Sequence, residues 1–387
     1  MSEGARGLVK YTLGCLLAGG LLLPGWAGAQ PKEEKKAQPK YVGSQVCVTC
    51  HQAQQNDWVA SGHPYKLRKA EDARRAGLPL PGGYTWDDIS YVIGGRNWKL
   101  RYVDKQGYII TSTGIMPDAK RDIFSLTDVK RGTPGKNQFN LKDGTWSNYH
   151  PGQKNLKYDC GACHTTGYSK EGHQDGMPGI VGTWAEPGVG CEACHGPGGD
   201  HVGGKGYKGN IQVRPDKAMC GQCHIRGKAD TIPASGGFIQ HHEQYNELLA
   251  NKHKALDCVT CHKPHVSAKF KDGLKVQCES CHPKQAADYK GSMMQLGGVK
   301  CADCHMARAT KTAIQKGPHE ADIRAHLFKI SLDPAASMFT PDGKFAKGFL
   351  TVEYACLACH GGRTKEWAMD ATKKGIHGYG KAVAGKK

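Results

Sequence analysis

The sequence predicts a fold of mostly short α-helices and irregular loops with a small β-rich insertion, in which aliphatic side chains fill little of the interior. Three observations support this prediction. Only 39% of the 387 residues are hydrophobic and 8% are aromatic. Gly (52) and Pro (19) make up about 18% of the chain, against a typical ~12%. The third observation is the 17 cysteines, whose arrangement indicates what replaces an apolar core.

Sixteen of the cysteines form eight Cys-x-x-Cys-His motifs, numbered here in chain order. They are motif 1 (Cys47, Cys50, His51), motif 2 (Cys160, Cys163, His164), motif 3 (Cys191, Cys194, His195), motif 4 (Cys220, Cys223, His224), motif 5 (Cys258, Cys261, His262), motif 6 (Cys278, Cys281, His282), motif 7 (Cys301, Cys304, His305) and motif 8 (Cys356, Cys359, His360). The remaining cysteine, Cys15, lies in an N-terminal apolar segment, so no cysteine is left over for a disulfide in the exported chain.

This motif has the spacing that attaches haem c. Two thiols three residues apart reach the two vinyl groups of one porphyrin, and the histidine that follows can bind the iron. Zinc ribbons do not require a histidine after every cysteine pair, and thioredoxin-like motifs use a single pair. We therefore predict eight haem c groups and the multihaem cytochrome c fold class, with short helices and loops wrapped around closely packed haems. The apolar macrocycles would take the place of the missing core.

Each iron also needs a sixth ligand, unless it is an open catalytic site. Eleven histidines lie outside the motifs. Nine of these are predicted iron ligands: His63, His150, His201, His241, His242, His253, His265, His319 and His326. We expect only one of the adjacent His241 and His242 to bind iron, and we expect His319 and His326 to share a helix. His173, in a Gly-rich loop, and His377, near the C-terminal end, are expected not to bind iron.

The N-terminal segment has the pattern of a secretory signal peptide. Arg6 and Lys10 precede an apolar run at Leu13–Leu23, and Ala27-Gly28-Ala29 resembles a cleavage site. The run is shorter than the ~20 residues of a membrane span, and an uncleaved anchor is the alternative. The predicted organisation is a signal peptide (1–29), a flexible charged leader (30–40), a first haem segment (41–66), a haem-poor β-rich subdomain (67–159), a six-haem region (160–330), and an eighth haem segment with the tail (331–387). The protein should be exported to the periplasm, the cell surface or the medium.

The haem-poor segment carries the β signals. Tyr84–Ile93 and Trp98–Thr113 are rich in β-favouring residues. Within the second range, Asp104-Lys105-Gln106-Gly107 lies between Leu100–Val103 and Tyr108–Ile110 and is typical of a hairpin turn. Two roles remain open for this subdomain: packing over the haems of motifs 1 and 2, or forming a docking or assembly surface.

The charge of the chain limits its partners. The formal net charge of +18 becomes +17 without residues 1–29, which hold two basic residues and one acidic residue. Sixteen propionates would lower it to about +9 with oxidised haems and about +1 with reduced haems. The basic balance therefore does not indicate a nucleic-acid partner. The expected partners are other redox proteins or copies of this chain, with a mineral or another cell as terminal acceptor, and at most peripheral contact with a membrane.

Four stretches resemble the exported multihaem cytochromes of metal-reducing and syntrophic bacteria. They are Tyr158–Tyr168, Gly190–Gly198, Phe238–Tyr245 and Ile323–Ile330. That group is related to the tetrahaem cytochromes of ammonia oxidisers and, more distantly, to octahaem hydroxylamine oxidoreductase and octahaem tetrathionate reductase. The resemblance covers most of residues 41–362. It implies low-potential bis-histidine haems stacked alternately parallel and perpendicular.

Two functions follow from these patterns. About 45 residues per haem in the exported chain leave little protein for a substrate pocket, which favours an electron conduit, and a filament subunit is one form of it. The alternative is an octahaem oxidoreductase acting on nitrogen or sulfur oxyanions at one open-site haem. Three more histidines than eight irons require keep that alternative open.

Overall fold

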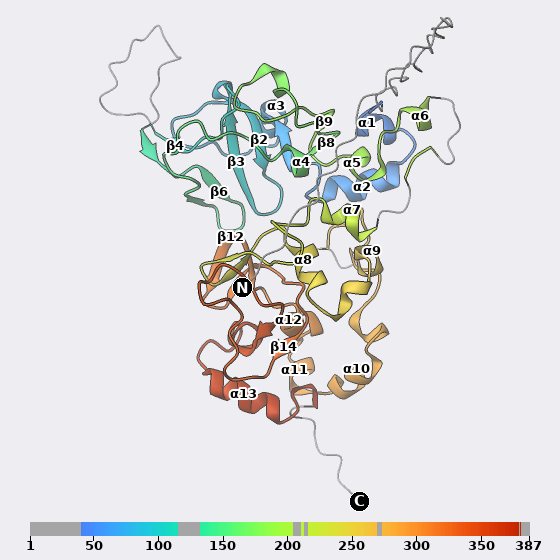
Figure 1. The fold of residues 1–387 in the computed structure, drawn as a ribbon, viewed down its shortest axis with the longest axis vertical. Helices are drawn as coiled ribbons and strands as arrows, with labels where there is room; N and C mark the ends of the chain where they lie inside the picture. The colour runs from blue at the N-terminus through green and yellow to red at the C-terminus, as the bar shows by residue number, and fades with distance from the viewer. Residues whose placement is uncertain are drawn as a thin grey trace, which may run out of the picture. The chain divides into compact units, whose positions relative to one another are not determined.

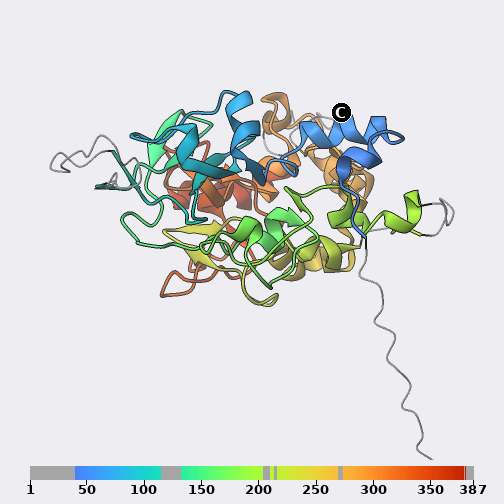
Figure 2. The same cartoon turned by 90° about the horizontal axis from the view of Figure 1, so that it is seen from above.

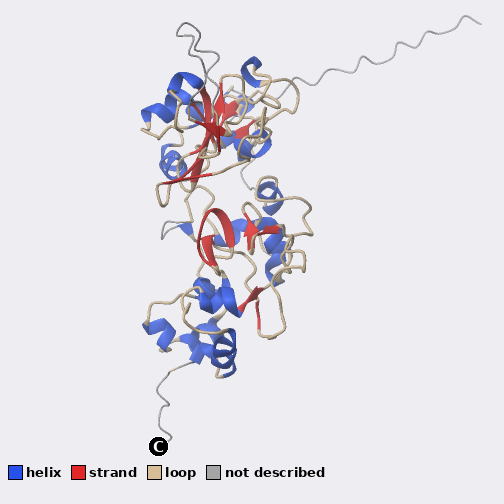
Figure 3. Ribbon diagram, turned by 90° about the vertical axis from the view of Figure 1, so that its left-hand side faces the viewer, coloured by secondary structure: helices blue, strands red, loops and turns tan. Residues whose placement is uncertain are grey.

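The structure is a computed structural model that describes residues 40–114, 132–203, 210–212, 216–268, 273–378 and 380. The expected signal peptide and all but residue 40 of the expected leader lie outside the described residues. Figures 1, 2 and 3 show short helices and small sheets joined by long loops. No helix in the described ranges is long and apolar enough to cross a membrane.

The expected β-rich segment contains a five-stranded sheet. Its strand order is β1-β2-β3-β6-β7, and every neighbouring pair is antiparallel. The strands are β1 (Leu67–Lys69), β2 (Ile89–Gly94), β3 (Lys99–Asp104), β6 (Gln138–Asn140) and β7 (Thr145–Ser147). The chain turns after β3 at Gly107, whose φ of 88° suits glycine, and the Tyr108 carbonyl accepts a hydrogen bond from the Asp104 amide. The turn thus lies where the sequence indicates it.

Both faces of this sheet are buried by alternating apolar side chains. On β3, Leu100 and Tyr102 face one cluster and Val103 faces the other, as the two-residue period of a strand requires. The first cluster consists of Ala70, Ala73, Ile89, Val92, Leu100, Tyr102 and Ile110. The second consists of Leu67, Tyr91, Ile93, Val103, Ile109, Tyr158, Ile180 and Trp184. The segment has the apolar core that the composition denies to most of the chain.

A second sheet lies within the motif-bearing region, where no sheet was expected. Its order is β10 (Ala234–Ser235), β11 (Phe238–Gln240), β12 (Thr310–Gly317), β13 (Glu320–Ile323), with β11 and β12 parallel. The expectation that His319 and His326 share a helix is therefore wrong. His319 lies in the turn between β12 and β13, and His326 follows β13. Alternating burial at Thr310 and Thr312, a two-residue period, favours the strand.

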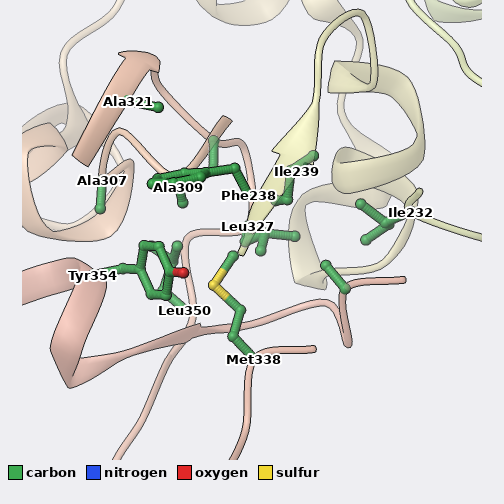
Figure 4. Close-up of a cluster of buried hydrophobic side chains, with 12 residues drawn as sticks. Ile232, Phe238, Ile239, Ala307, Ala309, Ala321, Leu327, Met338, Leu350 and Tyr354 are labelled. Atoms are coloured by element: carbon green, nitrogen blue, oxygen red, sulfur yellow. The ribbon is translucent and has the colours of Figure 1, made fainter. Parts of the chain in front are cut away.

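The core behind the second sheet joins it to the segment before motif 8. Figure 4 shows Phe238, Leu327, Leu350 and Tyr354 converging in one buried cluster. The Phe238 and Tyr354 rings meet edge to face with centroids 6.0 Å apart. The cluster fixes the approach to motif 8.

Most helices of the described chain are one or two turns long. Several contain the motif itself, because one helical turn places residues three apart on the same side and so brings both thiols together. The α-helices are α1 (Ser44–Cys47), α2 (Gln52–Ala60), α3 (Ala70–Arg75), α4 (Gly161–His164), α5 (Cys191–His195), α6 (Gly199–Val202), α7 (Lys217–Gly221), α8 (Gln244–Leu249), α9 (Cys258–Cys261), α10 (Pro283–Tyr289), α11 (Met293–Leu296), α12 (Cys301–His305) and α13 (Lys365–Lys373).

The other short elements complete the described chain. The 3₁₀ turns are η1 (Trp86–Asp88), η3 (Gln174–Gly176), η4 (Lys252–Ala255), η6 (Cys278–Ser280) and η8 (Ile376–Gly378), and η7 (Glu353–Leu357) is a π-helical turn. The remaining strands are β4 (Ser112–Thr113), β5 (Thr133–Pro134), β8 (Thr165–Thr166), β9 (Glu186–Pro187), β14 (Ile330–Ser331) and β15 (Leu350–Thr351). They pair as β4–β5, β8–β9 and β14–β15.

A buried carboxylate ties the start of the described chain to motif 3. Glu192, between the two cysteines of motif 3, is 3% exposed. Its carboxylate accepts hydrogen bonds from the backbone amides of Val42 and Gly43, at 3.0 and 2.8 Å, and from that of Gly198. The segment before motif 1 is therefore held against motif 3.

Candidate haem-binding sites

The motifs converge on one connected cavity of about 4140 Å³. Both cysteines of motifs 1 to 7 line it, as does Cys356 of motif 8. Ordinary small-molecule pockets hold roughly 300–1,000 Å³, so this space is several times larger. It lies where an apolar core would stand in another protein, and it has room for several flat macrocycles beside their attachment cysteines.

Seven motif histidines each face a second imidazole across this cavity. An iron bound by two imidazoles at about 2 Å holds the ring centres about 6 Å apart. The facing pairs are His51 and His201 (6.5 Å), His164 and His242 (6.5 Å), His195 and His265 (6.1 Å), His224 and His63 (6.3 Å), His262 and His326 (6.2 Å), His282 and His253 (6.0 Å), and His305 and His377 (6.0 Å). The residues therefore fit haem iron bound between two histidines.

The pairs agree only in part with the expected ligands. Six of the nine expected histidines stand opposite a motif histidine: His63, His201, His242, His253, His265 and His326. The other three lie elsewhere. His150 is exposed beside Tyr149, His241 lies against His242, and His319 lies against Tyr354.

His377 differs from its expectation, because its ring lies 6.0 Å from that of His305. Helix α13 buries Ala368 and Met369, and the turn after it, η8, packs against α10, which brings the C-terminal segment back to motif 7. The amphipathic pattern of α13 is the sequence signal that could have indicated this return. His173 faces no motif histidine, and its Nδ1 lies 2.5 Å from the Ile180 carbonyl.

Burial favours the neutral form of three of the paired imidazoles. It is the largest cause that lowers the pKa of His63 to about 4 and the pKa values of His164 and His326 to about 3. A neutral imidazole keeps the lone pair that binds a metal.

The second ring nitrogen is also held in some of the pairs. His305 Nδ1 lies 2.8 Å from the Phe328 carbonyl, and His224 Nδ1 lies 3.0 Å from the Gln244 amide oxygen. These bonds leave Nε2 free to bind the iron and fix the ring orientation.

Contacts between cysteines of different motifs reveal the order in which the motifs adjoin. Thiols make side-chain contacts in four pairs: Cys47 with Cys191, Cys163 with Cys223, Cys220 with Cys258, and Cys278 with Cys301. In three further pairs one thiol lies close enough to raise the pKa of the other: Cys194 acts on Cys220, Cys281 on Cys261, and Cys356 on Cys304. The motifs thus adjoin in the order 1-3-4-5-6-7-8, and motif 2 branches from motif 4.

Four basic side chains gather beside motif 2, and we name them the basic cluster: Lys66, Lys99, Arg101 and Arg226. Burial lowers the pKa of Lys99 well below its usual value. The Arg101 guanidinium lies 3.3 Å from the centre of the Tyr149 ring. Arg226 Nη2 lies 3.4 Å from His241 Nε2, and Arg226 Nε lies 3.5 Å from the buried Glu243 carboxylate.

The basic cluster keeps the neighbouring His241 uncharged and favours anions. Burial is the largest cause that lowers the pKa of His241 to about 2, and the neighbouring basic side chains lower it further. Anionic groups, either haem propionates or a small oxyanion, suit such a place. Sequence reasoning missed the cluster because its members are scattered from residue 66 to residue 226.

Motif 8 differs from the other seven. The His360 ring packs against the indole of Trp367, with ring centres 4.9 Å apart. In the described residues, which include every histidine of the chain, no imidazole faces His360 at the 6.0–6.5 Å of the other pairs.

The family model for cytochrome c554 and c-prime matches residues 136–196, which hold motifs 2 and 3. The chain is 27% identical over 168 residues to the multihaem cytochrome MtrA of Shewanella baltica, covering 40% of this chain and 46% of that protein. It is 24% identical over 402 residues to the dissimilatory sulfite reductase MccA of Wolinella succinogenes, covering 76% of this chain and 56% of MccA. The chain thus spans about half the length of these curated relatives.

Solved structures show the same fold. The octahaem sulfite reductase MccA of Wolinella succinogenes superposes with a TM-score of 0.61 at 19% identity, over 83% of this chain and 65% of that one. The outer cell wall cytochrome OcwA gives 0.51 at 19% identity, over 86% of each chain. The undecahaem cytochrome from the S-layer of Carboxydothermus ferrireducens gives 0.52 at 19% identity, over 88% and 60%. In its motifs, its sequence likeness and its fold, the chain resembles multihaem c-type cytochromes.

Proposed function

We propose that this chain carries eight haem c groups and transfers electrons through them as an exported electron carrier. The observation that supports this most is the set of seven facing imidazole pairs, six along one continuous row of motifs and the seventh at motif 2, which branches from it. Each bound group would supply an iron that alternates between ferric and ferrous states and so carries one electron. The cysteines would hold these groups in the cavity, and the paired histidines would bind those seven irons from both sides.

The layout suggests where electrons enter and leave. Motifs 1 and 8 stand at the two ends of the row of contacts, so partners would exchange electrons there. Those partners are other redox proteins or copies of this chain, with a mineral or another cell as terminal acceptor, and a filament is one arrangement of such copies. The propionates reduce the positive charge, so we propose no nucleic-acid partner and at most peripheral contact with a membrane.

The test compares the loss of motif 4, which lies in the row, with the loss of motif 2, which branches from the row and serves as the control. A photosensitiser is attached to Asn56→Cys, an exposed position on α2 next to motif 1, and haem reduction is followed after a flash. In one variant Cys220 and Cys223 of motif 4 become Ser, and in the control Cys160 and Cys163 of motif 2 become Ser. We expect loss of motif 4 to confine fast reduction to motifs 1 and 3, while loss of motif 2 leaves the row continuous. Equal reduction in both variants would contradict the proposed row.

The basic cluster favours a second candidate, the reduction of a sulfur or nitrogen oxyanion beside motif 2. MccA, which this chain resembles, is a sulfite reductase. The basic cluster and the neutral His241 would bind such an anion. His242 already faces His164. Catalysis at this iron would therefore need His242 to leave it. Anaerobic mixing of the fully reduced protein with sulfite or nitrite decides between the candidates. Rapid reoxidation that is lost in Lys99→Ala would favour the enzyme, and we expect none.

A further inference from the structure

Several contacts fix the position of motif 8 on the side of its own histidine, His360. Its first cysteine lies in the π-helical turn η7, which a 2.8 Å ion pair between Lys365 and Glu353 ties to α13. The Tyr354 hydroxyl donates a hydrogen bond to the Gly237 carbonyl, which ties the same turn to the second sheet. Trp367 supports the His360 ring at 4.9 Å. The cysteine pair and His360 are thus held from three sides.

The opposite side of motif 8 has a different character. Cys359 is exposed, as are several other motif cysteines, but motif 8 alone has a cysteine and a histidine, Cys359 and His360, that do not line the large cavity. Every other motif histidine has an imidazole 6.0–6.5 Å away, and among the described residues His360 has none. Solvent therefore reaches this motif directly.

His319 is an unpaired histidine that contacts the turn carrying Cys356. Its ring meets the Tyr354 ring edge to face, with centroids 5.3 Å apart. It lies in the turn that joins β12 to β13, and Gly317 and Glu320 pair on either side of that turn. In the structure this ring packs on Tyr354 and does not face His360 at the distance of the other pairs.

We propose that the iron held by motif 8 has an open sixth position that binds a small exogenous ligand of the π-acceptor class. This inference rests on the proposed attachment of haem at motif 8. The site is separate from the basic cluster, which lies beside motif 2. It places a ligand-accessible iron at the end of the row of motifs.

Carbon monoxide is the probe, added to the fully reduced holoprotein. We expect about one carbon monoxide per chain, seen as a shift in roughly one eighth of the Soret absorbance. Changing Cys356 and Cys359 to Ser should abolish this shift, while changing Cys160 and Cys163 of motif 2 to Ser should preserve it. A fully loaded protein that binds no carbon monoxide would overturn the inference, as would binding that survives the loss of motif 8.

Two further measurements separate the remaining explanations. His319→Ala should bind carbon monoxide as the unaltered protein does. If only the variant binds it, His319 is the sixth ligand and the inference is wrong. The haem count, from pyridine haemochromogen and intact mass, is measured on the same samples. A count below eight contradicts the proposed function, whereas eight haems without carbon monoxide binding contradict this inference alone.

Discussion

The β-rich segment and the motif-bearing region solve the problem of burial in different ways. Around β2 and β3, Ile89, Val92, Leu100 and Tyr102 are buried completely and pack against one another. Around motifs 1 to 7, the side chains line a cavity of about 4140 Å³ instead. The side chains of the β-rich segment form its core, whereas the chain around motifs 1 to 7 leaves space for a core made of cofactor.

This difference predicts that the two regions depend unequally on haem. Apolar burial drives folding whether the surface belongs to side chains or to a macrocycle. The five-stranded sheet should therefore persist where the haem is missing, whereas the motif helices around the cavity should not.

The largest effect is expected for protein produced without haem attachment. Hydrogen exchange should show amides of β2 and β3 still protected, because their apolar clusters are complete. Amides of the motif helices should lose at least roughly a hundredfold in protection. Equal protection in both regions, with or without haem, would contradict the comparison.

His377→Ala should change one of the eight haem sites without unfolding the chain. Its imidazole faces that of His305 at 6.0 Å, so its removal should convert one low-spin ferric iron to high spin, visible by electron paramagnetic resonance. The control is His173→Ala, since His173 faces no motif histidine. An unchanged spectrum for His377→Ala would return His377 to the role expected from the sequence.

Leu100→Ala should weaken only the β-rich segment. Leu100 is 0% exposed, and removing such a side chain from a core costs about 3 kcal/mol in the free energy of unfolding. The haem absorbance should not change, because this cluster contains no motif residue. Leu296→Ala, at a side chain that is 74% exposed, is the control and should have little effect. A large shift in haem potentials for Leu100→Ala would show that the two regions are not independent.

Glu192→Ala should loosen the start of the described chain. Its carboxylate accepts amide hydrogen bonds from Val42 and Gly43, and leaving buried donors unpaired costs about 1–3 kcal/mol. Faster hydrogen exchange at these two amides would report the loss. Glu279 occupies the same place in motif 6 but is exposed, so Glu279→Ala serves as the matched control. Similar effects for both variants would contradict the proposed tie.

The local features were predictable from the sequence, and the long-range pairings were not. The motifs and the turn at Gly107 follow from short-range spacing and from residues that favour turns. His63 and His265, by contrast, face the histidines of motifs 4 and 3, which are distant in the chain. Such pairing depends on tertiary arrangement, which spacing does not encode.

The same limit explains the other differences. The branch at motif 4 departs from chain order because Cys163 meets Cys223, a contact between segments sixty residues apart. His319 was assigned to a helix because seven residues separate it from His326, yet alternating burial along β12 forms a strand. In that segment, a two-residue period competes with a helical one, and contacts with the neighbouring strands decide between them.

The order of the motifs is tested most directly by a crystal structure of the haem-loaded protein. We expect eight irons whose nearest neighbours follow the order 1-3-4-5-6-7-8, with the iron of motif 2 beside that of motif 4. A row that follows chain order, with motif 2 between motifs 1 and 3, would contradict this layout and the electron path proposed from it.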